Sequence, residues 1–467
     1  SHSKGVEMKL RSFRLALLTA TFLFLASCQT TQQPDPASRI TVIEGATVID
    51  GVLDSPIEDA ILVIEGDTIR NVGRRGSFEV PENATRIDAA GKTIMPGMFN
   101  LHGHIGMAEG MVRGWENNNP ERILRDANIY LYYGVMHALS LGIDHDPMIV
   151  AQADQRAGRA GGARLYSAGT GFAAKDGWRP EGVAGINRPT TPEEAREMVQ
   201  REAAKPADAI KIWVDDRLGE LPKISMELCE AIIDEAHKHD LKVFVHIFYL
   251  EDAKELMRLG VDVIAHSVRD AEIDEEYIQL AREAGITQLA TLVGHSANIA
   301  YVQGADFLDD PGLPLLFPAS VLETVGSKEY QQRLAENLSE RSGYSTSETA
   351  VKNTEKVVAA GIPIAVGTDS SGSGRFQGLW EHREMELLVN TGLTPMQAIQ
   401  AATINAARVL GVDNRYGTIE PGKVADLIVL NADPLADITN SRKIDSLWMN
   451  GELVDRAALT SGDVASQ

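Results

Sequence analysis

The feature that most constrains the fold of this chain is a repeated alternation of short apolar runs with amphipathic helical patterns. Eight apolar runs have the character of buried strands, at residues 96–104, 137–145, 162–168, 209–214, 242–246, 263–266, 287–291 and 364–369. Amphipathic stretches that predict helices include residues 192–204, 226–239, 250–259, 274–284 and 347–360. Strands that alternate with helices form parallel sheets, and eight such units close a ring. We therefore expect an α/β fold, a (β/α)8 TIM barrel spanning residues 96–411.

The two ends of the chain carry a different pattern. Residues 39–95 and 412–467 contain short alternating runs separated by glycines, which are hairpin signals. The pair Asn450-Gly451 lies between two such runs and is a strong signal for a tight turn. We therefore predict one small, discontinuous β-domain built from both ends, with the barrel inserted between them.

The N-terminus predicts export. Residues 1–7 are interpreted as the remnant of an added tag, and a basic region begins at Met8. An apolar run at 15–25 follows, and Leu-Ala-Ser-Cys ends at Cys28. This order resembles a bacterial lipoprotein signal, so residues 1–27 are expected to be tag remnant and signal peptide. Cys28 is then predicted to carry lipid that anchors the protein to the membrane, facing the periplasm. An ordinary signal peptide with a chance cysteine is the alternative.

Composition narrows the partners and the redox chemistry. A formal net charge of −22 argues against nucleic-acid binding, which requires basic patches. Residues 28–38 are polar and interrupted by prolines, which predicts a flexible tether. The chain has two cysteines, so a lipidated Cys28 would leave Cys229 without a disulfide partner. Cys229 lies in an amphipathic stretch and is predicted to be buried helix packing.

Side chains that commonly bind metals lie at the ends of several predicted strands. They are four histidines, one lysine and one aspartate: His102, His104, Lys211, His246, His266 and Asp369. Because the carboxyl ends of barrel strands meet at one face, these side chains are expected to form one site. The imidazoles, the carboxylate and the lysine are enough ligands for two metal ions.

Each motif alone has another explanation. A His-X-His pair inside a barrel can be satisfied by hydrogen bonds, and the same holds for the single histidines His246 and His266. Lys211 can pair with Asp215 or Asp216. If it does not, burial between apolar neighbours lowers its pKa, and a neutral amine can add carbon dioxide to give a carbamate that bridges two cations.

Taken together, these motifs resemble the amidohydrolase superfamily. The resemblance covers residues 40–456 and includes Gly-Lys-Thr-Ile-Met-Pro-Gly-Met-Phe-Asn-Leu-His-Gly-His and Leu-Thr-Pro-Met-Gln-Ala-Ile. It implies a split β-sandwich beside the barrel. It also implies one metal on His102, His104 and Asp369, another on His246 and His266, and a carboxylated Lys211 between them. Zinc is the expected metal, and a hydroxide bridging the two ions is the implied nucleophile, with Asp369 as the proton-transferring catalytic residue.

The resemblance favours hydrolysis of an amide bond in a small substrate, of the peptide or N-acyl amino acid type. Deaminase-like members generally use one metal and lack the bridging lysine, so Lys211 argues for the binuclear, peptidase-like or imidazolonepropionase-like branch. Cyclic amide, lactone and phosphoester hydrolysis are alternatives, since the same nucleophile could perform them. A non-catalytic lipoprotein that binds metal or ligand is a further alternative, and a homo-oligomer is left open.

Four residues are predicted to contact the substrate: Tyr249, His295, Arg375 and His382. Dipeptidase members often place a tyrosine two residues after the strand-five histidine; here that position is Phe248, and Tyr249 is next. Arg375 and Arg179 lie in glycine-rich loops and are candidate anion binders, with solvated surface positions as the alternative. Residues 292–345 are expected to form an excursion over the site.

Overall fold

The computed structural model describes residues 39–178, 185–340 and 347–460. The predicted signal peptide (1–27), the tether (28–38) and the lipidation residue Cys28 lie outside these residues. Within the described ranges, no helix combines the length and the apolar character needed to span a membrane.

Seven of the eight predicted core strands form regular parallel strands. One sheet has the order β10–β9–β6, with β6 at Met98–Gly103, β9 at Val135–Ser140 and β10 at Arg164–Ser167. The other runs in chain order through β11 (Ala209–Val214), β12 (Lys242–Ile247), β13 (Val263–Ala265) and β14 (Thr287–Leu289). The fold is therefore of the mixed α/β class, as the sequence predicted.

Isolated parallel bridges connect the two sheets: Phe172 with Ile212, Gln288 with Ile364, and Gly103 with Ser370. The backbone N–H of Leu101 also donates to the carbonyl of Val366 (3.0 Å). This order of neighbours is the one that a TIM barrel requires. Regular closure of an eight-stranded ring stays a prediction.

Two predicted strands differ from the structure. β9 ends at Ser140 rather than at residue 145, because Gly142 has a φ of +95° and turns the chain away. A Cβ at Gly142 would also overlap the side chain of Lys211. Residues 364–369 make isolated bridges instead of a regular strand, and Asp369 at their end has a φ of +57°.

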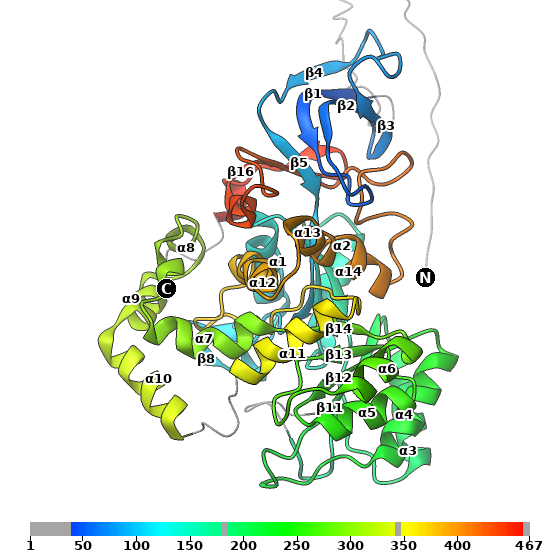
Figure 1. Cartoon of the computed structure of the whole chain (residues 1–467), viewed down its shortest axis with the longest axis vertical. Helices are drawn as coiled ribbons and strands as arrows, with labels where there is room; N and C mark the ends of the chain where they lie inside the picture. Colours follow the sequence, from blue (N-terminus) through cyan, green and yellow to red (C-terminus); the bar gives the residue numbers. More distant parts are fainter. Residues whose placement is uncertain (1–38, 179–184, 341–346, 461–467) are drawn as a thin grey trace, which may run out of the picture.

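Helices follow the core strands and cover them (Figure 1). Their bounds are α1 Pro120–Tyr132, α2 Asp146–Arg156, α3 Pro192–Ala203, α4 Met226–Lys238, α5 Leu250–Arg258, α6 Glu275–Ala284, α11 Ser347–Ala359, α12 Leu379–Asn390, α13 Pro395–Ala402 and α14 Ile404–Val409. The side chains of Thr191, Ser225 and Asp274 cap α3, α4 and α6 by accepting from a backbone N–H three residues on. Cys229 is buried in α4, as predicted.

The long stretch after β14 is mostly helical. It contains α7 (Leu292–Val302), a short 3-10 turn (Asp306–Asp309), α8 (Leu313–Leu316), α9 (Ala319–Gly326) and α10 (Lys328–Glu340). These elements lie on one side of the molecule (Figure 1). They pack with α12 around a separate apolar cluster that includes Tyr301, Phe317 and Trp380. The excursion therefore has its own core.

Strands from both chain ends pair in one eight-stranded sheet, seen as blue and red segments at one end of Figure 1. Its order is β17–β16–β15–β5–β1–β2–β3, with β4 beside β1. The strands are β1 Ile40–Val48, β2 Ile57–Glu65, β3 Thr68–Arg74, β4 Thr85–Asp88, β5 Thr93–Pro96, β15 Leu427–Leu430, β16 Ile444–Met449 and β17 Glu452–Leu453. The two ends thus meet as expected; the sandwich layers and the boundaries 39–95, 96–411 and 412–467 stay predictions.

We expect Gly451→Ala to destabilise this sheet more than a matched substitution at Gly91. Asn450 and Gly451 form the turn between β16 and β17 with φ values of +55° and +70°. Both glycines have positive φ, but a Cβ at Gly451 would overlap the carbonyl of Gly66, whereas a Cβ at Gly91 would meet nothing within 4 Å. Thermal or denaturant unfolding should show a loss of about 1 kcal/mol for Gly91→Ala and more than about 2 kcal/mol for Gly451→Ala. Equal losses would contradict the steric argument.

Candidate functional site

The ends of the core strands open into a cavity of about 560 Å³. Its lining contains five of the six predicted metal ligands: His102, His104, His246, His266 and Asp369. His102 lies on β6 and His246 on β12, while His104 and His266 lie just beyond the ends of β6 and β13. Asp369 lies in the segment that makes isolated bridges. The fold therefore brings together residues that are up to 267 positions apart in the sequence (369 − 102).

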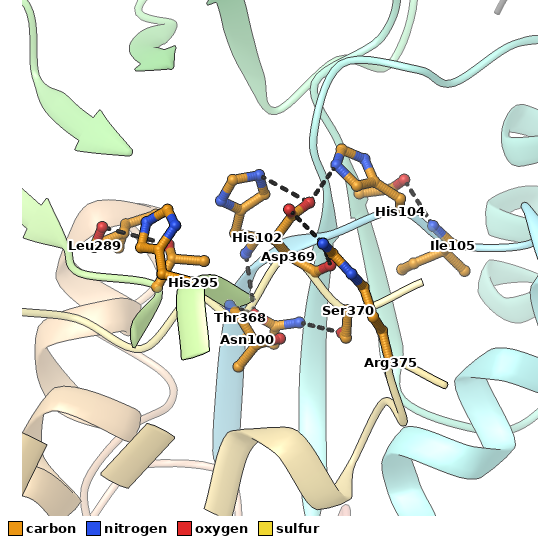
Figure 2. A network of polar contacts seen from close by, with 12 residues as sticks. Asn100, His102, His104, Ile105, Leu289, His295, Thr368, Asp369, Ser370 and Arg375 are labelled. Atoms are coloured by element: carbon orange, nitrogen blue, oxygen red, sulfur yellow. Dashed lines mark hydrogen bonds and ion pairs between the residues drawn. The ribbon is translucent and has the colours of Figure 1, made fainter. Parts of the chain in front are cut away.

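Asp369 lies at the centre of the cluster (Figure 2). Its Oδ1 atom is 2.8 Å from His104 Nε2 and 3.7 Å from His102 Nε2, and its Oδ2 atom accepts from Arg375 Nη1 at 2.8 Å. One potential ligand atom from each of His102, His104 and Asp369 lies within 4.8 Å of the others, close enough to hold one ion. His246 and His266 are adjacent, with ring centroids 4.6 Å apart, and His266 is 4.9 Å from His102.

Two of these side chains are presented by unusual backbone. His266 and Asp369 have φ values of +72° and +57°, in the left-handed region that residues other than glycine rarely adopt. Each follows an extended run, so the reversal of φ redirects the side chain at the strand end. Backbone strain of this kind persists where surrounding contacts fix it, and it is common at functional sites.

Lys211 on β11 has no exposed surface, and its Nζ atom has no hydrogen-bond partner among the described residues. The carboxylates considered as its partners are used elsewhere. Asp215 accepts from His246 Nε2–H at 2.8 Å, and Asp216 accepts from the Tyr249 hydroxyl at 2.6 Å. Burial lowers the pKa of Lys211 to about 7, and the nearby carboxylate of Asp369 raises it only in part.

The protonation states of the cluster suit cation binding. Burial lowers the pKa of His102 and His266 well below the usual range, and that of His104 to about 4. Burial alone would raise the pKa of Asp369, but Arg375 and His104 outweigh it and hold the pKa well below its usual range. Neutral imidazoles and an ionised carboxylate are the forms that bind metals.

Unpartnered atoms give an independent test of whether these residues fit divalent cations. The Nδ1 atoms of His102, His104 and His266 are buried without a hydrogen-bond partner in the described part of the chain, as is Lys211 Nζ. Buried polar groups are normally satisfied, so such a concentration at one place indicates a missing ligand. His246 differs: its Nε2–H donates to Asp215, which leaves Nδ1 for a cation, an arrangement typical of metal-binding histidines.

Several residues that support the site were missed by sequence reasoning. The side-chain oxygen of Asn100 accepts from the backbone N–H groups of His102 (3.0 Å) and Thr368 (3.2 Å), so one amide ties both ligand-bearing segments together. Glu384 is buried on α12 and accepts from the N–H groups of Leu292 and Val293, where α7 begins. Asn100 directly precedes Leu-His-Gly-His, but no local pattern indicates what Glu384 or Asp215 would contact.

The predicted substrate contacts divide into two groups. His295 and Arg375 line the cavity. The side chains of Tyr249 and His382 are absent from the described lining. The Tyr249 hydroxyl donates to Asp216, and His382 is fully buried, with Nδ1 2.8 Å from Ser441 Oγ and Nε2 2.9 Å from the carbonyl of Tyr133. Both ring nitrogens of His382 are therefore engaged within the fold. Arg179 lies outside the described residues.

The tautomer of His295 follows from its partner. Arg269 Nη1 lies 3.1 Å from His295 Nε2, and because a guanidinium can only donate, Nε2 must accept. The proton of a neutral His295 is then on Nδ1. Burial, followed by Arg269, holds the pKa of His295 well below its usual range, so the ring is neutral. His295 is therefore a neutral lining residue of the cavity with its N–H on Nδ1.

Comparison with known proteins identifies the family of this chain. The sequence profile of the amidohydrolase family matches residues 93–454. 5-Methylthioadenosine/S-adenosylhomocysteine deaminase of Symbiobacterium thermophilum is 26% identical over 426 residues, covering 84% of this chain and 85% of the deaminase. Ochratoxinase of Aspergillus niger is 22% identical over 456 residues, covering 89% of this chain and 87% of that enzyme. A solved Xaa-Pro dipeptidase with bound methionine has a TM-score of 0.70 and 24% identity, covering 89% of this chain and 99% of its own.

The chain therefore belongs to the amidohydrolase family and has the TIM-barrel-like α/β fold of its structural neighbours. It is an enzyme, a hydrolase that acts on carbon–nitrogen bonds. Divalent metal ions are general in this family, and the cluster of His102, His104 and Asp369 is a candidate position for one.

We expect Asn100→Ala to destabilise the protein strongly. The substitution leaves two buried backbone N–H groups without an acceptor and opens a cavity, a combined loss of about 2–5 kcal/mol in the free energy of unfolding. Tyr130→Phe is the matched control, because it removes one hydroxyl, which accepts from Asn100 Nδ2 at 3.1 Å and bonds to Ser370 Oγ at 2.8 Å, and leaves both backbone N–H groups with their acceptor; it should cost about 1 kcal/mol. Denaturant unfolding distinguishes the two; equal losses would show that Asn100 does not join the segments as described.

Proposed function

We propose that this protein hydrolyses an amide bond in a small substrate, of the peptide or N-acyl amino acid type, using two divalent metal ions. The observation that carries the proposal is Lys211: a fully buried lysine whose amine has no hydrogen-bond partner among the described residues. It interacts electrostatically with the imidazoles of His102, His104 and His246 and with the carboxylate of Asp369. A lone ammonium would be costly there, whereas a carbamate between two cations would be neutralised on both sides.

His102, His104 and Asp369 would hold one ion, His246 and His266 the other, and carboxylated Lys211 would lie between them. The carbamate forms when the neutral amine of Lys211 attacks carbon dioxide and releases one proton. Zinc is the expected metal because imidazole ligands predominate. When bound, the two ions would supply a nucleophilic water derivative at neutral pH and polarise the scissile carbonyl.

The chain's own residues would move the protons. Asp369, kept ionised by Arg375 and His104, is positioned to take a proton from the attacking water and pass it to the leaving nitrogen. Neutral His295, which lines the cavity, would donate a hydrogen bond to substrate through its Nδ1–H. Cyclic amide, lactone and phosphoester hydrolysis are alternatives for the same groups. Deamination, the activity named for one relative, is disfavoured because it does not need a lysine at position 211.

We also propose that the enzyme is an exported lipoprotein, anchored at Cys28 and facing the periplasm. The support is the order of three features near the N-terminus: a basic region, an apolar run, and then Leu-Ala-Ser-Cys, which ends at Cys28. Assembly into a homo-oligomer is compatible with this proposal and is not required by it.

We expect chelation or Asp369→Asn to abolish turnover. Removing a positioned proton-transfer group lowers rates by about 10²–10⁴-fold, and loss of a ligand adds to this. The measurement is product analysis over a panel of dipeptides, N-acyl amino acids, lactones and phosphoesters, with Asp309→Asn, an exposed carboxylate, as the control. Paired release of amine and carboxylate supports the proposal, whereas acid without amine points to ester cleavage. A metal-free preparation that retains full activity would exclude it, and a chain that binds ligands without any turnover would be a binding protein.

We expect carbamate formation on Lys211 to increase with pH. With a pKa of about 7, roughly a tenth of the amine is neutral at pH 6 and roughly nine tenths at pH 8, and only the neutral amine reacts with carbon dioxide. In metal-free protein, ¹³C NMR with labelled bicarbonate should therefore show a lysine carbamate signal that grows between these pH values. The metal content at pH 8 should be two ions per chain, falling to one in Lys211→Met and staying at two in the exposed control Lys328→Met. Equal metal content in Lys211→Met and the parent protein would overturn the bridging role.

A further inference from the structure

The cavity has the opposite charge to the rest of the protein. The whole chain carries a formal net charge of −22, yet the described lining includes four arginines: Arg113, Arg217, Arg269 and Arg375. The same described lining contains one carboxylate, that of Asp369. An electropositive cavity in an acidic protein concentrates anions at the site.

Two of these arginines are already engaged. Arg375 pairs with Asp369 at 2.8 Å. Arg269 is buried, and it donates to the carbonyls of Ser267 and Ile247 and to His295. Both support the site, but their N–H groups are largely committed to partners within the fold.

Arg217 is held differently. Its guanidinium lies over the ring of Trp178, 4.4 Å from the centroid, and none of its N–H groups is bonded to a residue in the described ranges. Stacking fixes the plane of a guanidinium, and its N–H groups remain able to bind a carboxylate through two parallel hydrogen bonds. The guanidinium of Arg217 is therefore held in place by Trp178, with its side-chain N–H donors directed to no residue in the described ranges.

Two independent contacts fix Arg217 relative to His246. Trp178 stacks on the imidazole of His246, with centroids 5.4 Å apart and an interplanar angle of 23°, so a single indole contacts both the guanidinium and the histidine. Asp215 accepts from the backbone N–H of Arg217 at 2.8 Å through Oδ1 and from His246 through Oδ2. The backbone of Arg217 also has a φ of +52°, which a residue other than glycine adopts at a cost.

We propose that Arg217 binds the carboxylate of the substrate, so that the enzyme selects small amides with a carboxylate near the scissile bond. The inference rests on the proposed hydrolysis for the identity of that bond, but not for the binding itself. A carboxylate on Arg217 would place the adjoining amide toward His246 and the other ligands. Trp178 and Trp213, which also line the cavity, offer apolar surface to the remainder of the substrate. Dipeptidase members often have a tyrosine at the position that Phe248 occupies here. Arg217 would take over the binding role of that tyrosine.

The test is calorimetric titration of the metal-loaded enzyme with 3-phenylpropanoate and with 3-phenylpropan-1-ol, which has the same skeleton without the charge. We expect the carboxylate to bind the parent protein at least about tenfold more tightly than the alcohol, and Arg217→Gln to weaken carboxylate binding by about 10- to 100-fold with little change for the alcohol. Arg217→Lys keeps the positive charge but loses the two parallel N–H donors of the guanidinium, so an intermediate affinity is expected. Arg258→Gln, on the exposed side of α5, is the control and should bind as the parent does.

The outcomes are distinct. Undiminished carboxylate binding in Arg217→Gln would overturn the inference, because the carboxylate would then be held elsewhere, for example on the metal ions. Equal affinity for the acid and the alcohol would also overturn it. Unfolding temperatures of all variants exclude a folding defect as the cause of lost binding. If carboxylate binding depends on Arg217 but no amide is cleaved, the proposed reaction fails while the ligand preference stands.

Discussion

The position of the Asp369 carboxylate, partly buried against neutral imidazoles, is the constraint on which the site depends. Burial alone would raise the pKa of this group, and Arg375 and His104, which lie against it, lower the pKa well below its usual range. The same burial keeps the histidines neutral and lowers the pKa of Lys211 to about 7. Burial at the strand ends therefore gives the histidines and Lys211 low pKa values, while neighbouring groups keep Asp369 ionised. Formation of the site requires strand ends from the first and last parts of the core to meet, which is what the fold provides.

Much of this architecture was predictable because its signals are local. Apolar runs of strand length, each ending in a ligand-type side chain, located six candidate ligands, and five of them line one cavity. The helices from α3 to α6 and the Asn450-Gly451 turn likewise follow from nearby patterning and capping residues. Pairing of the two chain ends in one sheet was inferred from similar runs at both ends, a weaker signal that the sheet order bears out.

The remainder depends on contacts between residues far apart in the sequence. His382 was expected near substrate because it follows a loop at the site, but its ring is buried between Ser441 and the carbonyl of Tyr133. Nothing local distinguishes Asp215 from Asp216, yet only Asp215 bonds to His246 in the structure. The left-handed backbone of His266 and Asp369 is also not encoded by glycine, because it is imposed by the surrounding packing.

Asp215 joins the candidate metal-ligand cluster to the part of the cavity that contains Arg217. One of its oxygens orients His246, and the other fixes the turn that presents Arg217. Trp178 connects the same two residues through their side chains. Because both contacts involve the same pair, the spacing between the guanidinium of Arg217 and the imidazole of His246 is set by short, direct contacts rather than by a long loop. A site that must hold a small molecule in one orientation benefits from a fixed spacing, since misplacement of about 1 Å can lower a rate by about 10²-fold.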